Sequence, residues 1–176
     1  MNNVSDRIGA LRAAFERLME WVVIALMLIL FIEVTLGVVF RMIGQPLVWY
    51  DEVASVLLAW VTYYGAALAA LKRAHIGFPG FVRSLAPAVR IWVVILAEAL
   101  TIGFFILLAW VGWTVLGVLA TDYLVGLPDV SNRYVQSVIP IGAALFIIAE
   151  LLLLPETLRD ARAGRAVGSS VAERLL

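Results

Sequence analysis

The chain has 176 residues, of which 64% are hydrophobic, and its mean hydropathy is +1.01. Soluble domains are about half apolar, so this composition places the chain among membrane proteins, at a length that suits one domain and not two. Thirteen basic residues balance thirteen acidic ones and there is no cysteine, which gives no indication of nucleic-acid binding and excludes disulfides, thiolate metal sites and thiol chemistry.

Four segments are long and apolar enough to cross a bilayer, whose hydrocarbon core of about 30 Å needs roughly 20 helical residues. They are residues 18–40, 53–71, 91–120 and 134–154. The first is too long for the apolar stretch of a cleaved signal peptide, so we expect it to be retained. The third exceeds the bilayer thickness, which predicts tilt, a bend or a protruding end. We predict an all-α integral membrane protein, with residues 1–176 forming a single membrane domain that ends in a tail over residues 156–176.

The basic residues indicate how these spans are oriented. Eleven of the thirteen lie before the first span, between the second and third, or after the fourth, whereas only Arg41 and Arg133 lie in the other two connections. Because Lys and Arg concentrate in cytoplasmic loops, we expect both termini and the tail in the cytoplasm. The alternation also supports an even number of spans.

The N-terminal segment leaves two alternatives open. Ile8, Leu11, Phe15 and Leu18 recur three or four residues apart and form one apolar helical stripe. This pattern is typical of an amphipathic helix that lies on the membrane surface. It also fits the first turns of the first span.

Three carboxylates, Glu33, Glu98 and Glu150, lie within the predicted spans. A carboxylate in the hydrocarbon region costs several kcal/mol unless it is paired, neutralised or near water. One interpretation makes one of them a proton or cation site. The other, which we favour, makes them structural partners for arginines of this chain or for polar groups of another subunit.

His75 is the only histidine, and it follows the second span at the predicted cytoplasmic interface. Haem anchors need paired histidines and metal sites need several ligands together, so we expect no cofactor and no metal. A role in capping the helix or facing the headgroups fits this position. A single histidine also leaves no Ser-His-Asp set, and no nucleotide-binding glycine loop is present, so we do not expect an enzyme.

Small residues and tryptophans indicate where helices pack. The second span carries small residues four apart, Gly65 with Ala69 and Ala66 with Ala70, a spacing that lets helices approach closely. Large rings deep in a span favour positions that face protein. Three tryptophans are expected to do so: Trp60, Trp110 and Trp113.

Residues 39–76 carry a pattern that identifies a family. An arginine closes the first span, a tryptophan precedes the acidic residue that opens the second, a tryptophan and a glycine lie within it, and a His-Ile pair follows it. These segments are Val39-Phe40-Arg41-Met42, Leu47-Val48-Trp49-Tyr50-Asp51-Glu52, Trp60, Gly65 and Arg73-Ala74-His75-Ile76. Together with Val138-Ile139-Pro140-Ile141-Gly142, they resemble the DctQ-like small membrane subunit of tripartite ATP-independent periplasmic (TRAP) transporters. The chain departs from the family where Gly77-Phe78-Pro79 replaces an acidic residue.

The resemblance implies a multi-pass protein of the bacterial inner membrane, part of a secondary active, sodium-coupled uptake transporter for organic acids. A large membrane subunit would carry substrate and sodium, and a periplasmic binding protein would deliver the substrate. The small subunit would then be a non-catalytic scaffold, in contact with membrane lipids, that also helps dock the binding protein. We expect structural or interface roles for Arg41, Trp49, Glu52, Trp60, Gly65, His75, Glu33 and Glu98.

One hypothesis concerns the turn between the first two spans. Arg41 and the acidic pair Asp51 and Glu52 flank a short Gly-Gln-Pro turn. We predict that Arg41 pairs with one of these carboxylates and fixes the angle between the two helices.

Two other function classes have a similar four-span topology. A small homodimeric proton-coupled exporter would use a membrane-embedded glutamate such as Glu33, but exporters of that kind are usually shorter. A quinone-coupled enzyme that generates disulfides would have four spans and a similar length. It would need periplasmic cysteine pairs, and the chain has no cysteine.

Overall fold

The computed structural model describes residues 2–73 and 84–163, with the side chains of residues 2–8 left out. Its helices are α1 (Asn2–Met42), α2 (Tyr50–Leu71), α4 (Pro87–Val118), the 3₁₀ helix η1 (Leu119–Thr121), α5 (Asn132–Gln136) and α6 (Val138–Ala163). In this part of the chain four segments are long and apolar enough to cross a membrane: Gly9–Met42, Tyr50–Leu71, Pro87–Thr121 and Asn132–Ala163. The predicted all-α fold with four spanning helices is therefore confirmed.

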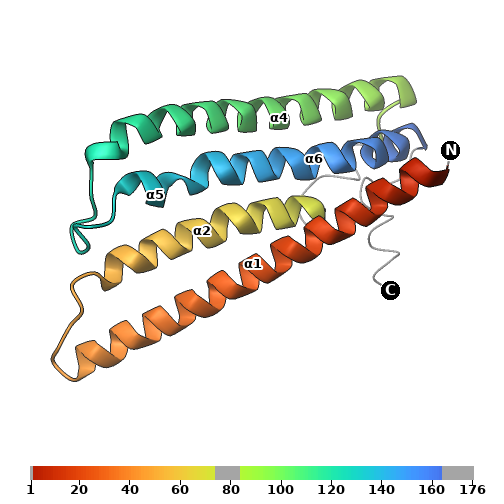
Figure 1. The fold of residues 1–176 in the computed structure, drawn as a ribbon. Helices are drawn as coiled ribbons and strands as arrows, with labels where there is room; N and C mark the ends of the chain where they lie inside the picture. Colours follow the sequence, from red (N-terminus) through yellow and green to blue (C-terminus); the bar gives the residue numbers. More distant parts are fainter. Residues whose placement is uncertain (1, 74–83, 164–176) are drawn as a thin grey trace.

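The four long helices lie in a row. The main contacts join α1 to α2, α2 to α6 and α6 to α4 (Figure 1). The α1–α2 and α4–α5 connections lie at one end of the row, which we call the loop end; the N-terminus and the end of α6 lie at the other, the terminal end. The edge helices α1 and α4 each pack mainly on one neighbour, so most of their apolar surface stays outside the chain's own core.

Helix α1 is continuous from Asn2 to Met42, and no proline interrupts it. At 1.5 Å per residue its 41 residues extend about 60 Å, roughly twice the hydrocarbon thickness. The N-terminal apolar stripe therefore belongs to the first turns of this long helix, and no separate surface helix forms. Within that stripe Phe15 packs against the core, whereas Leu11 and Leu18 stay exposed.

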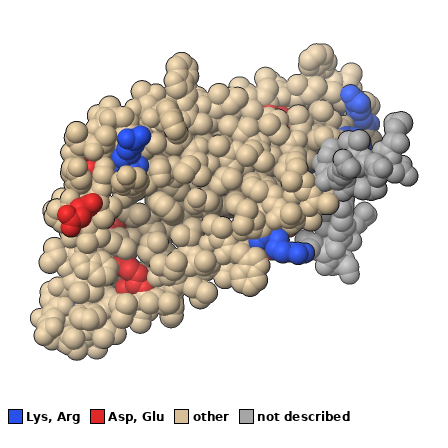
Figure 2. Space-filling model, in the orientation of Figure 1, with Lys and Arg blue, Asp and Glu red and all other residues tan. Residues whose placement is uncertain are grey.

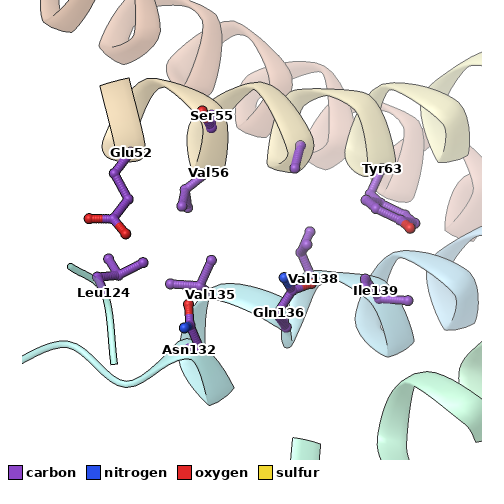
Figure 3. A pocket seen from close by; sticks show the side chains of 11 residues that line it. Glu52, Ser55, Val56, Tyr63, Leu124, Asn132, Val135, Gln136, Val138 and Ile139 are labelled. Carbon is purple, nitrogen blue, oxygen red and sulfur yellow. The ribbon is translucent and has the colours of Figure 1, made fainter. Parts of the chain in front are cut away.

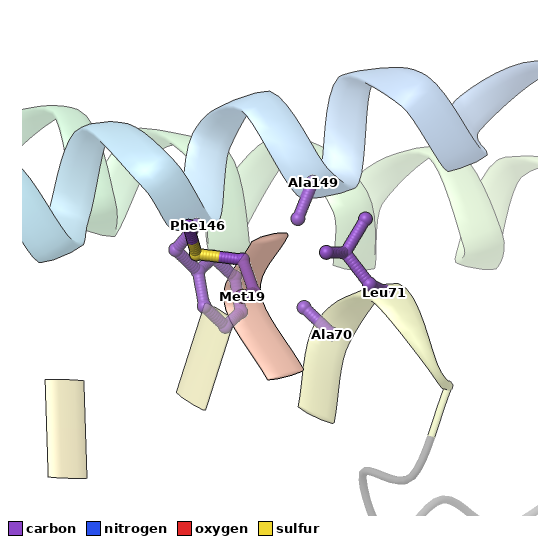
Figure 4. Packing of buried hydrophobic residues seen from close by; sticks show 5 residues of the cluster. All are labelled: Met19, Ala70, Leu71, Phe146 and Ala149. Carbon is purple, nitrogen blue, oxygen red and sulfur yellow. The ribbon is translucent and has the colours of Figure 1, made fainter. Parts of the chain in front are cut away.

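A core forms near the terminal end, where α1 approaches α6. Its buried residues come from three helices and are Met19, Ala70, Leu71, Phe146 and Ala149 (Figure 4). The ring of Phe105 on α4 stacks on Phe146, with centroids 3.7 Å apart and planes 10° from parallel. In a membrane such contacts act through dispersion and close approach, because lipid tails are as apolar as the side chains. The small alanines let α2 and α6 meet here.

The broad face of the row seen in Figure 2 is covered mostly by uncharged side chains. On α4 three tryptophans point away from the rest of the chain: Trp92 is 72% exposed, and Trp110 and Trp113 are each 71% exposed. At 1.5 Å per residue, Trp92 lies about 27 Å from Trp110 and about 32 Å from Trp113, close to the hydrocarbon thickness. This spacing fits two interfacial belts on one helix edge. Of the three tryptophans expected to face protein, only Trp60 is half-buried within this chain.

Candidate functional site

At the loop end, Glu52 holds the α4–α5 connection. It lies in the first turn of α2, and its carboxylate accepts hydrogen bonds from the backbone N–H groups of Val125 (2.9 Å) and Gly126 (2.7 Å). A β-carbon at Gly126 would lie 2.7 Å from the Cα of Trp49, so the loop can reach the carboxylate only because this residue is glycine. Trp49 itself precedes the first turn of α2. Glu52, Trp49 and the loop thus form one unit, which we call the Glu52 clamp.

The loop that the Glu52 clamp holds is itself well ordered by hydrogen bonds. Tyr123 and Ser131 form an antiparallel bridge, and the Leu124 N–H donates to the Val130 carbonyl at 3.0 Å. Asn132 donates to Asp122 twice, from its backbone N–H to the carbonyl at 2.8 Å and from its side-chain amide to the carboxylate at 2.7 Å. The loop therefore presents a fixed tip.

The predicted pairing of Arg41 with Asp51 or Glu52 is wrong. Among the described residues no ion pair joins them, and the Arg41 guanidinium instead lies over the Tyr50 ring, 5.9 Å from its centroid. The Tyr50 ring occupies the space that a β-carbon at Gly37 would fill. Aromatic packing on glycine therefore sets the approach of α1 and α2, while the Glu52 carboxylate turns to the α4–α5 loop.

A break in the fourth spanning segment lies beside Trp60. Helix α5 ends at Gln136 and α6 begins at Val138, two residues before Pro140. A proline has no N–H to donate to the carbonyl four residues earlier, so the series of backbone hydrogen bonds along the helix is interrupted near Pro140. The Trp60 indole N–H donates to the Val135 carbonyl at 3.0 Å. Trp60 thus satisfies a backbone acceptor at the break, in a region where unsatisfied carbonyls are costly.

An open cavity of about 430 Å³ lies between α2 and the α5–α6 segment (Figure 3). Its lining mixes aliphatic residues with carboxylate, amide and hydroxyl groups, and consists of Glu52, Ser55, Val56, Ala59, Tyr63, Leu124, Asn132, Val135, Gln136, Val138 and Ile139. The Glu52 carboxylate at its edge already accepts two backbone bonds. The described part of the chain therefore offers no unpaired charge for a ligand here.

Gly65 has no packing role within the described chain. No atom of another element lies within 4 Å of the position that its β-carbon would take. Of the small residues spaced four apart, Ala70 is buried in the core and Ala66 packs against it. A close glycine contact is found instead at Gly142, where a β-carbon would lie 2.8 Å from the Tyr63 Cβ. His75 lies outside the described residues.

At the terminal end, Arg73 links α2 to α4 and α6. Its guanidinium donates to the Leu153 carbonyl at 2.9 Å and to the Thr157 hydroxyl. It also interacts electrostatically with Glu150 and Glu98, which lie on α6 and α4 and interact with each other. Burial lowers the pKa of Arg73, although an arginine stays charged at neutral pH. Both glutamates therefore have an arginine of this chain as a partner.

The backbone at Arg73 is in the left-handed region, with φ of 50°. At the end of a helix this conformation is usually adopted by glycine. For a residue with a side chain this conformation costs about 1–2 kcal/mol. It directs the side chain back over the end of α2 towards α6. The helical periodicity of the sequence could not predict where the Arg73 side chain lies or which residues it contacts. Both depend on the backbone conformation just after the last turn of α2.

Two further cations, Arg12 and Lys72, form ion pairs that join α1 to α6 and to the end of α2. Arg12 donates to Glu156 on α6 at 2.7 Å and to the Leu71 carbonyl at 3.4 Å. Lys72 pairs with Glu20 and lies 4.0 Å from Glu16. The hydrogen bond with Glu20 is the main reason that the pKa of Lys72 is raised. Together with Arg73 these pairs tie all four long helices together at the terminal end.

Glu33 is a charged candidate without a hydrogen-bond partner in the described part of the chain. Its side chain lies on the stripe of α1 that faces α2, and the residue is 8% exposed. Both carboxylate oxygens are buried, and neither has a hydrogen-bond partner among residues 2–73 and 84–163. The charge that interacts with it is another carboxylate, that of Asp51. In the described chain no group of three or more His, Cys, Asp or Glu side chains is placed to hold a metal ion.

Comparison with known proteins gives one family. The family model described as "Tripartite ATP-independent periplasmic transporters, DctQ component" matches residues 26–160. The match begins within α1 and includes α2, α4, α5 and most of α6. No curated protein matches the chain.

Proposed function

Since the chain belongs to the DctQ component family of tripartite ATP-independent periplasmic transporters, we propose that it is the non-catalytic scaffold subunit of a sodium-coupled organic-acid uptake system. In this role it stabilises a large membrane subunit that carries the substrate and the ions. The family match over residues 26–160 is the observation that carries the proposal. The subunit lies in the inner membrane among lipids, and its function involves no nucleic acid.

The row of helices supports a scaffold role. The edge helices leave long apolar surfaces uncovered, and a second membrane protein or lipid must cover them. The ion pairs at the terminal end and the Glu52 clamp at the loop end hold the row at both ends. A structure fixed at both ends suits the static part of a transporter.

The proposed orientation places the loop end in the periplasm and the terminal end in the cytoplasm. In the sequence, eleven of the thirteen basic residues lie before the first span, between the second and third, or after the fourth, which agrees with the retention of Lys and Arg in the cytoplasm. The loop end then presents the rigid tip held by Glu52, at which Val125 is 89% exposed. We propose that this tip helps receive the periplasmic binding protein.

A pull-down of the tagged subunit from native membranes in mild detergent, followed by mass spectrometry, tests the proposal. We expect a stoichiometric large hydrophobic partner. The partner and the small subunit together, supplied with the binding protein, should move an organic acid into liposomes in response to a sodium gradient. A lone small subunit that transports a substrate by itself would refute the proposal and favour a proton-coupled exporter that uses Glu33.

A further inference from the structure

The buried carboxylate of Glu33 lacks a counter-charge. Leaving a carboxylate buried and unpaired carries a large desolvation penalty, and the penalty grows when a second carboxylate lies near. Glu33 has Asp51 as that neighbour. Arg41, the next basic residue along α1, lies eight residues further on, about 12 Å along the axis, and its guanidinium lies over the Tyr50 ring.

A groove opens beside Glu33 on the surface between α1 and α2. It has a volume of about 440 Å³ and is lined by Leu30, Val34, Asp51, Ala54, Ser55 and Leu58. Glu33 does not itself line the groove, but it lies between the lining residues Leu30 and Val34 in the sequence of α1. Asp51 is exposed, and in the described chain no cation pairs with it. The Ser55 hydroxyl already donates to the Asp51 backbone carbonyl.

The charge of this groove determines which partner fits it. Its walls are mostly aliphatic, the Asp51 carboxylate lines it, and Glu33 interacts electrostatically with Asp51, which suits a long side chain with an apolar stem and a cationic end. Lys and Arg have this form, and they extend along apolar surface to place the charge at a distant polar group. Such a side chain would supply the charge that Glu33 and Asp51 lack.

We propose that the groove between α1 and α2 receives a lysine or arginine side chain of the large membrane subunit, whose charge meets Asp51 in the groove and compensates Glu33 beside it. This inference rests on the proposed function, because it names the surface through which the scaffold meets its partner. It places α1 and α2 against the large subunit and leaves the tryptophan edge of α4 to lipid.

Charge-neutral variants of the two acidic residues test the electrostatic part in the intact complex. Removing one member of a buried charge pair weakens association strongly, so Glu33→Gln should lower the affinity for the large subunit about thirty-fold. Asp51→Asn should lower it less, about three- to ten-fold, because Asp51 is exposed. Asp129→Asn is the matched control, since Asp129 is an exposed acidic residue at the same end, away from the groove.

The stability of the free subunit separates this role from a purely structural one. Glu33→Gln removes an unpaired buried charge, so the isolated subunit should melt at the same or a higher temperature while the complex weakens. A lower melting temperature of the free subunit would show that Glu33 stabilises its own chain, and would overturn the proposal. Unchanged affinity with Glu33→Gln would overturn it as well, because it would mean that the carboxyl is neutral and needs no cation.

Spin labels test the location. The chain has no cysteine, so one introduced cysteine carries one label. Leu58 in the groove and Leu107 on α4 are 57% and 55% exposed and form a matched pair. Addition of the large subunit should reduce the oxygen accessibility of a label at Leu58→Cys and leave the label at Leu107→Cys unchanged. Reduced accessibility at position 107 with no change at position 58 would refute the proposal. A fall in accessibility at position 58 as the concentration of the free subunit rises would refute it too, because a second copy of this chain would then fill the groove.

The two proposals fail in different ways. If no large subunit accompanies the wild-type protein, the proposed function fails. If the large subunit binds but position 58 stays accessible, only the groove assignment fails.

Discussion

The Glu52 clamp gives a prediction whose size follows from the structure. Replacing Glu52 with Ala removes the acceptor of two backbone bonds, from Val125 at 2.9 Å and Gly126 at 2.7 Å. A hydrogen bond to a charged group contributes about 1.5–3 kcal/mol, but loop amides near water regain part of this energy from solvent. We therefore expect the α4–α5 loop to lose about 2 kcal/mol of local stability in total. The core lies near the opposite end of the row and should be unaffected.

Hydrogen exchange measures this local loss. A change of about 2 kcal/mol in the opening free energy should accelerate exchange of the two amides about thirty-fold, while amides of α6 keep their rates. Glu52→Gln should give an intermediate value, because its amide keeps one acceptor oxygen and turns a donor towards the second N–H. Asp129→Asn serves as the control on the same loop. Equal protection of both amides in wild type and Glu52→Ala would refute the reasoning.

Four further predictions concern packing and charge elsewhere in the row. Trp60→Phe leaves the Val135 carbonyl without its donor and should destabilise the subunit by about 1 kcal/mol, seen as a lower melting temperature in detergent; an unchanged melt would mean that water or lipid replaces the bond. Gly142→Ala places a β-carbon 2.8 Å from a tyrosine β-carbon of α2 and should cost about 1–3 kcal/mol. Gly103→Ala meets nothing within 4 Å and should stabilise α4 by up to about 1 kcal/mol, and a loss of stability there would contradict the packing argument. The pKa of Lys72 is raised in the folded protein, so its ion pair contributes its full stabilisation at any pH below the ordinary lysine pKa of about 10.4. This stabilisation is lost as the pH rises through the raised pKa. The difference in melting temperature between wild type and Lys72→Gln should therefore be small, because the side chain is 43% exposed, and should vanish at strongly alkaline pH.

The spans and the family were predictable because both depend on local sequence. Apolar length alone identifies a spanning helix, so the four predicted spans match the four helices of the structure. The motif residues around Arg41, Trp49 and Trp60 lie close together in sequence, and the resemblance that they indicate is confirmed by the family match. Trp49 and Trp60 also have specific contacts in the structure, at Gly126 and at the Val135 carbonyl.

The partners of charged residues were not predictable in the same way. Arg41 and Glu52 have opposite charges and lie on either side of a short turn, which made a direct pair the simplest expectation. In the structure the Glu52 carboxylate reaches a loop more than seventy residues away, and Arg41 lies over Tyr50. Sequence separation carries no information about such contacts, and a carboxylate favours two convergent backbone N–H groups over a mobile cation at the surface.

By itself the sequence determined that this chain is a membrane protein of four helices, because hydrophobic length and the distribution of basic residues act on each segment separately. Only the tertiary structure decided that the helices lie in a row, that Glu98 and Glu150 share Arg73, and that Glu33 has no partner within the described chain. The physical reason is that the environment of a buried charge depends on which helix faces are opposed. In a membrane, where every face is apolar, the pattern of hydrophobic residues does not specify that choice.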